Sequence, residues 1–277
     1  MPLDLSNPRI TQYRVGDTGL LAFLGAESGM GKTTLVRGLI DAYGREEVLI
    51  LPVENKLLPL ADYDPPPLRW DEGEITHTRQ IDECLSYLEA QIAQGKPVPR
   101  YLVLDALSEW SDKKYREVRE KFPSREKSGS FDRFETFGLD GLDLIVRVRA
   151  LRGMIKIINC TMSRRPLGDG GGWKYNLYGN IVADNLARKV DLLLFLTDRS
   201  FELTDFAPDS KSLLKQYAGC GPVRVFQTAN RDGVICKDSS TKLAPFEPTE
   251  TAPGKRDGWP HLFGKISPAL APKEEAK

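Results

Sequence analysis

The residues best suited to chemistry lie in a glycine-rich stretch near the start of the chain, Ala26–Thr33, which reads AESGMGKT. The stretch follows the pattern A-x-x-x-x-G-K-T, with Ala26 where the strict phosphate-loop pattern has glycine. Its glycines let successive backbone N–H groups face inward around phosphate oxygens. Lys32 would neutralise β- and γ-phosphates, and the Thr33 hydroxyl would ligate Mg²⁺. The predicted nucleotide-binding set is Ala26, Glu27, Ser28, Gly29, Met30, Gly31, Lys32, Thr33 and Thr34.

The elements around this stretch must hold it in place. The apolar run Leu20–Leu24 predicts a buried strand before it, and Leu35, Leu39 and Ile40 predict the buried face of a helix after it. The amino end of that helix would add a positive dipole end beside the phosphates. Further strands are predicted at 48–53, 101–104, 154–158 and 190–196, with helices between them. This alternation predicts an α/β fold, a mostly parallel sheet with helices on both faces.

Acidic residues follow two of these strands. Asp105 ends the run Tyr101–Leu104, a pattern in which the carboxylate holds Mg²⁺ through water. Glu54 ends the strand at 48–53, and Glu109 lies shortly after Asp105. Either glutamate is a candidate general base.

The segment after the fourth strand, SRRPLGDGGGWKYNLYGN, combines glycines, cations and aromatic rings. Stacking surfaces beside cations suit single-stranded nucleic acid. The bland alternative is a flexible loop whose aromatic rings pack back on the domain. The candidate DNA-binding residues are Arg164, Arg165, Trp173, Lys174 and Tyr175.

The last third of the chain predicts a hairpin and then a tail. Residues 223–228 and 234–236 read as paired strands around Asn230–Gly233. Arg231 at the tip could reach a neighbouring subunit's γ-phosphate as an arginine finger, with Arg224 and Arg199 as weaker alternatives. The composition then shifts to Pro, Gly, Lys and Glu. We therefore expect one domain over 1–247 and a flexible tail over 248–277, in which Trp259, Leu262 and Phe263 could dock on a partner.

The composition is that of an ordinary globular protein. The 39 basic and 39 acidic residues balance, which argues against a surface coated in positive charge for nucleic acid. The four cysteines show no metal-type spacing, so we expect a reduced, cytoplasmic setting. The first residues lack an apolar core segment and no apolar run is long enough to span a bilayer, so we expect neither a signal peptide nor membrane contact.

Over roughly residues 15–240 the chain resembles phage-encoded P-loop ATPases of the AAA family with a RecA-like core. The resemblance is carried by the glycine-rich stretch, Glu54, Asp105, Asn159 or Thr161, Asn230–Arg231 and the phrase NLYGNIVADNLARKVDLLLFL. Some of these ATPases act in single-strand annealing or recombination. The chain departs from bacterial recombinases in its glycine-rich loop and in showing no amino-terminal oligomerisation helix.

The resemblance implies ATP binding, Mg²⁺-dependent hydrolysis, and a homo-oligomeric ring or filament on single-stranded DNA. It implies that Glu54 activates the attacking water, and that Asn159 or Thr161 senses the γ-phosphate. A single-strand-binding or replication protein could dock on the tail.

Two other classes of function remain open at this stage. A nucleoside or small-molecule kinase would use the same loop together with an acceptor pocket and an arginine-rich lid. An ATP-switched assembly factor would bind a protein instead of DNA.

Overall fold

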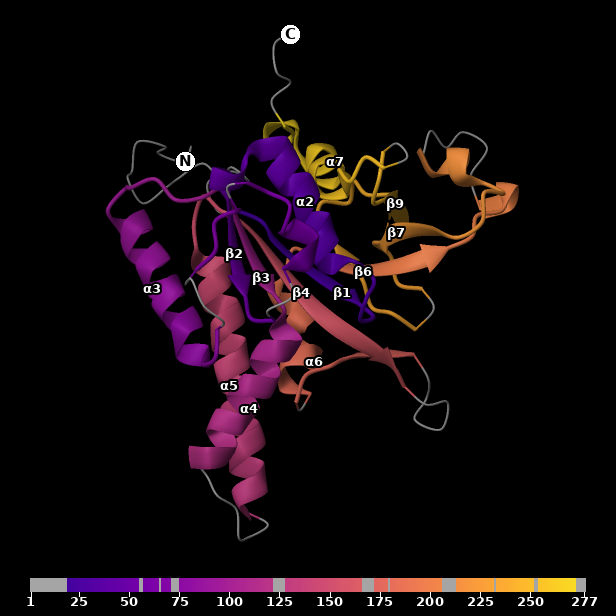
Figure 1. Ribbon diagram of the computed structural model, residues 1–277. Helices are drawn as coiled ribbons and strands as arrows, with labels where there is room; N and C mark the ends of the chain where they lie inside the picture. The colour runs from indigo at the N-terminus through magenta and orange to yellow at the C-terminus, as the bar shows by residue number, and fades with distance from the viewer. Residues whose placement is uncertain are drawn as a thin grey trace, which may run out of the picture.

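The chain forms a mostly parallel β-sheet with helices on both faces (Figure 1), as the sequence predicts. The computed structural model describes residues 19–54, 57–64, 66–70, 75–121, 128–165, 172–178, 180–205, 213–231, 233–251 and 254–272.

Parallel strands form the centre of the sheet, in the order β2-β3-β4-β1-β6. The strand that precedes the glycine-rich loop, β1, lies between β4 and β6. Because parallel strands share their direction, their carboxyl ends meet at one edge, where the loop and the predicted acidic residues lie. The strands are β1 (Leu21–Ala26), β2 (Val48–Pro52), β3 (Tyr101–Asp105), β4 (Ile155–Arg164) and β6 (Leu192–Arg199).

The remaining strands are antiparallel, and they correct the predicted hairpin. β7 (Val223–Gln227) pairs with β6 on one side and with β9 (Phe246–Pro248) on the other. Val234 makes only an isolated bridge to Arg231. The hairpin prediction was wrong because β7 takes its two partners from distant segments. The short strands β5 (Trp173–Tyr175) and β8 (Lys237–Asp238) pair with β4 and β6.

Alternate residues of each central strand face two different helix layers. On β1, Leu21 and Phe23 pack in the core covered by α3, α4, α5 and α6, whereas Ala22 and Leu24 pack in the core covered by α2 and α7. Both faces are therefore buried, which explains the continuous apolar runs in the sequence. The helices are α2 (Lys32–Tyr43), α3 (Thr78–Ala93), α4 (Leu107–Lys121), α5 (Ser128–Ala150), α6 (Ile181–Lys189) and α7 (Gly258–Ile266). Single 3₁₀ turns occur at Arg45–Glu47, Leu58–Leu60, Leu203–Asp205, Leu213–Tyr217 and Pro268–Leu270.

The expected flexible tail is corrected by the structure, because its residues 254–272 pack on the domain. Trp259, Leu262 and Phe263 on α7 are fully buried. Trp259 contacts the rings of Phe226 on β7 and Phe263, with centroids 5.1 and 5.3 Å away. These residues share a core with α2, beside which α7 lies (Figure 1), and are not free to dock on a partner.

A buried ion pair fastens α7 to β9. The Glu247 carboxylate has no exposed surface, and it accepts hydrogen bonds from Lys265 Nζ at 2.6 and 2.8 Å and from the backbone N–H of Ala244 at 2.7 Å. These partners and His261 lower the pKa of Glu247, against the effect of burial. A buried carboxylate with this many partners fixes the position of the last helix.

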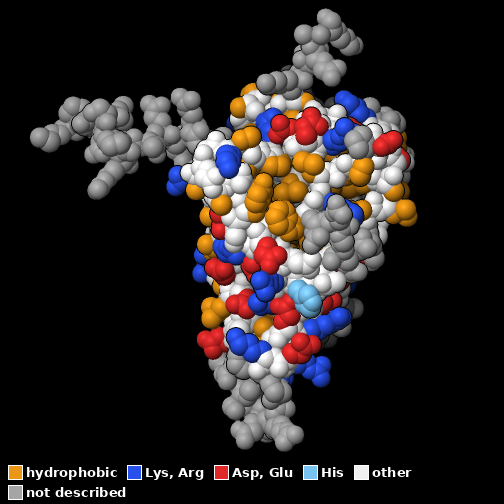
Figure 2. Space-filling model, turned by 60° about the vertical axis from the view of Figure 1, so that its left-hand side comes forward, with side chains coloured by type: hydrophobic (Ala, Val, Ile, Leu, Met, Phe, Trp, Pro, Cys, Tyr) orange, Lys and Arg blue, Asp and Glu red, His pale blue; other side chains and the backbone are white. Residues whose placement is uncertain are grey.

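The face that carries α3 has a mixed surface charge (Figure 2). Two of its arginines pair with acids: Arg147 on α5 contacts Asp82 and Glu89 of α3, and Arg79 contacts Glu83. This face therefore does not present the uniform positive charge that would attract nucleic acid. Within the described residues, none of the helices is both long and apolar enough to cross a membrane.

From the buried Lys156 on β4 we predict that the stability of the folded protein depends on pH. Its side chain is 1% exposed, and burial lowers its pKa to about 8 although Asp191 lies nearby. Its ammonium donates to the carbonyl of Leu151 at 2.9 Å, beyond the end of α5. Between about pH 8 and pH 10.5 Lys156 is protonated in the unfolded chain and largely neutral in the folded protein. The free energy of unfolding therefore rises with pH through that window.

We therefore expect the free energy of unfolding to rise by about 1–2 kcal/mol between pH 7.5 and pH 9.5 from this group alone. Urea unfolding of the wild type and of Lys156→Met at both pH values measures it. The difference between the two proteins should shift by that amount, and an unchanged difference would mean that Lys156 titrates as an exposed lysine does.

Candidate functional site

The glycine-rich loop lies between β1 and α2, with left-handed backbone at two of its glycines. Gly29 has φ 81° and Gly31 has φ 85°, and Gly31 caps the amino end of α2. These conformations favour glycine, because a Cβ atom is strained there. The loop therefore turns tightly and directs the first N–H groups of α2 toward its concave side.

Lys32 lies inside the curve of this loop. Its side chain is 8% exposed, and its ammonium donates to the carbonyl oxygens of Glu27 at 3.1 Å and Ala26 at 3.5 Å. A nearly buried ammonium among backbone groups gives the loop a positive centre. The ammonium can donate to a phosphate oxygen without the cost of drawing a long side chain from solvent.

Thr33, Asp105 and Asn159 meet at the carboxyl ends of their strands and the start of α2. The Thr33 hydroxyl donates to Oδ2 of Asp105 at 2.5 Å, and Nδ2 of Asn159 donates to Oδ1 of Asp105 at 3.1 Å. Asp105 is 4% exposed and Asn159 is fully buried. Within the described part of the chain, Oδ1 of Asn159 is buried and has no hydrogen-bond partner.

Asp105 is an electrostatically strained carboxylate. Burial raises its pKa, and the negative charge of Glu54 raises it further, whereas the hydrogen bonds from Thr33 and Asn159 and the charge of Lys32 lower it. A cation at this position would remove the cost of the buried charge.

Glu54 lies beside Asp105. Its backbone N–H donates to the carbonyl oxygen of Asp105 at 3.0 Å, and its carboxylate acts electrostatically on Asp105. Glu109 lies in the first turn of α4 and is half-buried. The choice of general base between Glu54 and Glu109 stays a prediction.

The second candidate sensor, Thr161, lies farther along β4. It pairs in register with Ala26, and its backbone N–H donates to Oγ of Ser108 at 3.4 Å. Asn159 is the candidate that contacts Asp105.

The donor set fits Mg²⁺ bound together with phosphates. Mg²⁺ prefers oxygen ligands, keeps several waters, and takes one or two protein ligands plus phosphate oxygens. Thr33 and Asp105 supply such oxygens, and the orphaned Asn159 oxygen could accept from a metal-bound water. Across the described residues there is no cluster of three or more His, Cys, Asp or Glu side chains that could hold a metal without a phosphate ligand.

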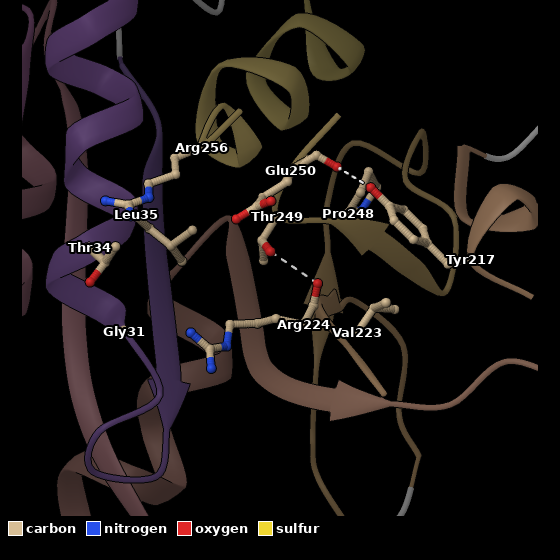
Figure 3. Close-up of a pocket in the computed structure, with 10 residues that line it drawn as sticks. All are labelled: Gly31, Thr34, Leu35, Tyr217, Val223, Arg224, Pro248, Thr249, Glu250 and Arg256. Carbon is tan, nitrogen blue, oxygen red and sulfur yellow. Dashed lines mark hydrogen bonds between the residues drawn. The ribbon is translucent and has the colours of Figure 1, made fainter. Parts of the chain in front are cut away.

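A cavity of about 230 Å³ opens beside the loop (Figure 3). One wall is the first turn of α2, and the opposite wall comes from β7 and from the segment that follows β9. Its lining residues are Gly31, Thr34, Leu35, Tyr217, Val223, Arg224, Pro248, Thr249, Glu250 and Arg256. Those from 248 onward fall in the region that the sequence assigned to a tail.

Arg224, and not the predicted Arg231, approaches the loop within this chain. A Cβ atom at Gly31 would lie 2.9 Å from Nη1 of Arg224, and Figure 3 shows this guanidinium pointing at the loop. Arg231 lies over the ring of Phe246, 5.5 Å from its centroid, and Arg199 lies 4.3 Å from the same centroid. A role for Arg231 toward a neighbouring subunit stays a prediction.

The predicted DNA-binding residues fall on a β-ribbon formed by the end of β4 and β5. Arg164, Arg165 and Lys174 are exposed. Trp173 is half-buried: its ring packs 4.7 Å from Phe195, and Arg164 lies 5.2 Å above it.

Tyr175 turns into the core, where its ring meets Phe23 edge-on at 5.3 Å and burial raises its pKa. Its ring is therefore not presented for stacking on a base. The glycines between 166 and 171 lie outside the described residues.

We compared the chain with protein-family models and with curated proteins. No protein-family model matches the chain, and no curated protein matches its sequence.

Proposed function

We propose that this protein binds ATP with Mg²⁺ at the glycine-rich loop and hydrolyses it, as a P-loop ATPase with a RecA-like core. The contact between Thr33 and Asp105, beside the nearly buried Lys32, carries this proposal. Residues 72 positions apart in the chain bring a hydroxyl and a carboxylate to one point, next to a loop that can cradle phosphate.

Each residue then has a role that follows from its position. Lys32 stabilises negative charge on the transferred phosphoryl group, and the loop N–H groups hold the other phosphates. Thr33 and Asp105 hold Mg²⁺, directly or through water. When bound, the ion neutralises charge that develops on the phosphates. Asn159 orients Asp105 and sets its position relative to β4.

Glu54 is the proposed general base. It lies two residues after β2, the strand next to that of Asp105, and it is half-buried. A carboxylate there can orient and deprotonate a water molecule that attacks the γ-phosphate. A carboxylate at this position suits hydrolysis, in which water is the acceptor of the phosphoryl group.

We further propose that single-stranded DNA binds the β4–β5 ribbon. Three exposed cations, Arg164, Arg165 and Lys174, gather there, beside the half-buried Trp173. The same strand carries Asn159 at the nucleotide site and Arg164 on the ribbon, so it links the two places physically. Assembly into a ring or filament on the strand is part of this proposal.

Steady-state ATP hydrolysis, measured with and without single-stranded DNA, tests this function. We expect DNA to stimulate hydrolysis by the wild type. The double variant Arg164→Ala, Lys174→Ala should keep its basal rate and lose most of the stimulation, since it removes phosphate contacts far from the reacting atoms. Arg119→Ala, an exposed arginine on α4, is the matched control.

Three other outcomes would redirect the proposal. Hydrolysis indifferent to DNA favours an ATP-switched assembly factor with a protein partner. Transfer of phosphate to a nucleoside in place of hydrolysis favours a kinase. Full stimulation of the double variant would mean that the ribbon does not contact DNA.

A further inference from the structure

The cavity beside the glycine-rich loop lies on the side away from Asp105. Its wall on α2 is formed by Gly31, Thr34 and Leu35, whereas Thr33 turns the other way and contacts Asp105. The γ-phosphate belongs near Asp105 and Glu54, because that is where the metal-binding oxygens lie. The cavity is therefore placed for the other end of a nucleotide, the nucleoside.

Two guanidinium groups converge on this cavity from one chain. Figure 3 shows Arg224 approaching from β7 and Arg256 from the segment before α7, both pointing toward the first turn of α2. Leu35, Val223 and Pro248 supply apolar surface between them. A flat aromatic base suits such a site, because guanidinium groups stack on π-systems and apolar side chains bury the ring faces.

Close packing brings Arg256 to this place. A Cβ atom at Gly38 of α2 would lie 1.8 Å from the carbonyl oxygen of Arg256, so only glycine allows the segment to lie against the helix. The Asp257 carboxylate accepts from the backbone N–H and the hydroxyl of Thr251 at 2.8 and 2.5 Å.

Two more contacts hold the strand side of the same segment. Oγ1 of Thr249 donates to the carbonyl of Arg224 at 3.0 Å, and the Tyr217 hydroxyl donates to the carbonyl of Glu250 at 3.1 Å. The segment is thus joined both to α2 and to the strand that carries Arg224.

We infer that residues 248–251 and 254–257 form a wall of the nucleotide site, and that Arg224 and Arg256 hold the nucleoside in cis. The inference rests on the proposed function. It follows from it that docking of the carboxy-terminal segment and binding of the nucleotide stabilise each other. Linkage requires this reciprocity, because a ligand that contacts the docked segment favours the docked state.

Two ligands separate the nucleoside contacts from the phosphate contacts. Inorganic tripolyphosphate fills the loop alone, whereas ATP also reaches the cavity. We expect Arg256→Ala to weaken ATP binding about tenfold, since it removes one stacking cation, and to leave tripolyphosphate binding within about twofold. Arg119→Ala should change neither affinity.

Hydrogen exchange measures the linkage in the unmodified chain. ATP should slow amide exchange in residues 254–266, and tripolyphosphate should slow it less. Equal affinities of the wild type and Arg256→Ala for ATP, with ATP bound and no protection of that segment, would overturn the inference. Failure of the wild type to bind either ligand would instead overturn the proposed function.

Discussion

Glu54→Gln is expected to bind Mg²⁺ and ATP with an affinity within about threefold of the wild type and to hydrolyse ATP at least about 100-fold more slowly. The amide keeps the size of the side chain but cannot accept a proton from the attacking water. Binding should survive, because the phosphates are held by the loop, Lys32 and Thr33 and not by Glu54. Single-turnover hydrolysis and equilibrium binding, measured on the same preparation, separate the two effects.

Glu109→Gln is the matched comparison. It makes the same change on α4, and we expect its turnover to stay near that of the wild type. If Glu54→Gln turns over normally and Glu109→Gln does not, the base is Glu109 and the geometric argument from Asp105 is wrong. Glu54→Gln should also lower the pKa of Asp105, because it removes a negative charge that raises this pKa in the wild type.

Trp259→Ala is expected to lower the free energy of unfolding by about 3–5 kcal/mol. The indole is fully buried between α2 and the sheet, so its removal leaves a cavity as well as a loss of buried apolar area. Denaturant unfolding at neutral pH measures the change.

Trp259→Phe is the control for that experiment. It keeps the ring contacts with Phe226 and Phe263 and removes an indole N–H that has no hydrogen-bond partner in the described structure. Removing the unpartnered N–H group offsets part of the loss of buried apolar area. We therefore expect Trp259→Phe to lower the free energy of unfolding by less than about 1.5 kcal/mol. If Trp259→Ala left the free energy of unfolding unchanged, the carboxy-terminal segment would not pack on the domain. It would then be the flexible tail that the sequence composition suggested.

The parts of the fold that the sequence predicts well are those set by local pattern. The strands at 48–53 and 101–104 are continuous apolar runs because both faces of the sheet are covered, and the residues of α3 (Thr78–Ala93) show a clear apolar stripe. The meeting of Thr33 with Asp105 follows from two local facts, the loop motif before a helix and an acid at the end of a parallel strand.

The carboxy-terminal helix carried a usable signal that composition hid. Trp259, Leu262, Phe263 and Ile266 recur at helical spacing, and all are buried. The surrounding Pro, Gly, Lys and Glu residues dominate the average over 248–277 and indicate disorder. Periodicity over a short window was the better guide than composition over a long one.

The positions of Arg224 and Arg256 at the proposed nucleotide site could not be predicted from local sequence pattern. Arg224 reaches the loop because β7 pairs antiparallel with β6, and Arg256 reaches it because Gly38 lets the chain cross α2 closely. Both are consequences of tertiary packing between segments far apart in sequence. For the same reason the sequence could not show that Tyr175 packs on Phe23 while Lys174, next to it, faces solvent.

The central claim is that the glycine-rich loop and Asp105 form one site for ATP and Mg²⁺, and calorimetric titration with ATP tests it most directly. We predict one site per chain in the presence of Mg²⁺, weaker binding when Mg²⁺ is chelated, and a loss of at least about 100-fold in affinity for Lys32→Ala, whose ammonium neutralises the phosphates. Equal affinity of the wild type and Lys32→Ala for ATP, or no binding by the wild type at all, would contradict the account.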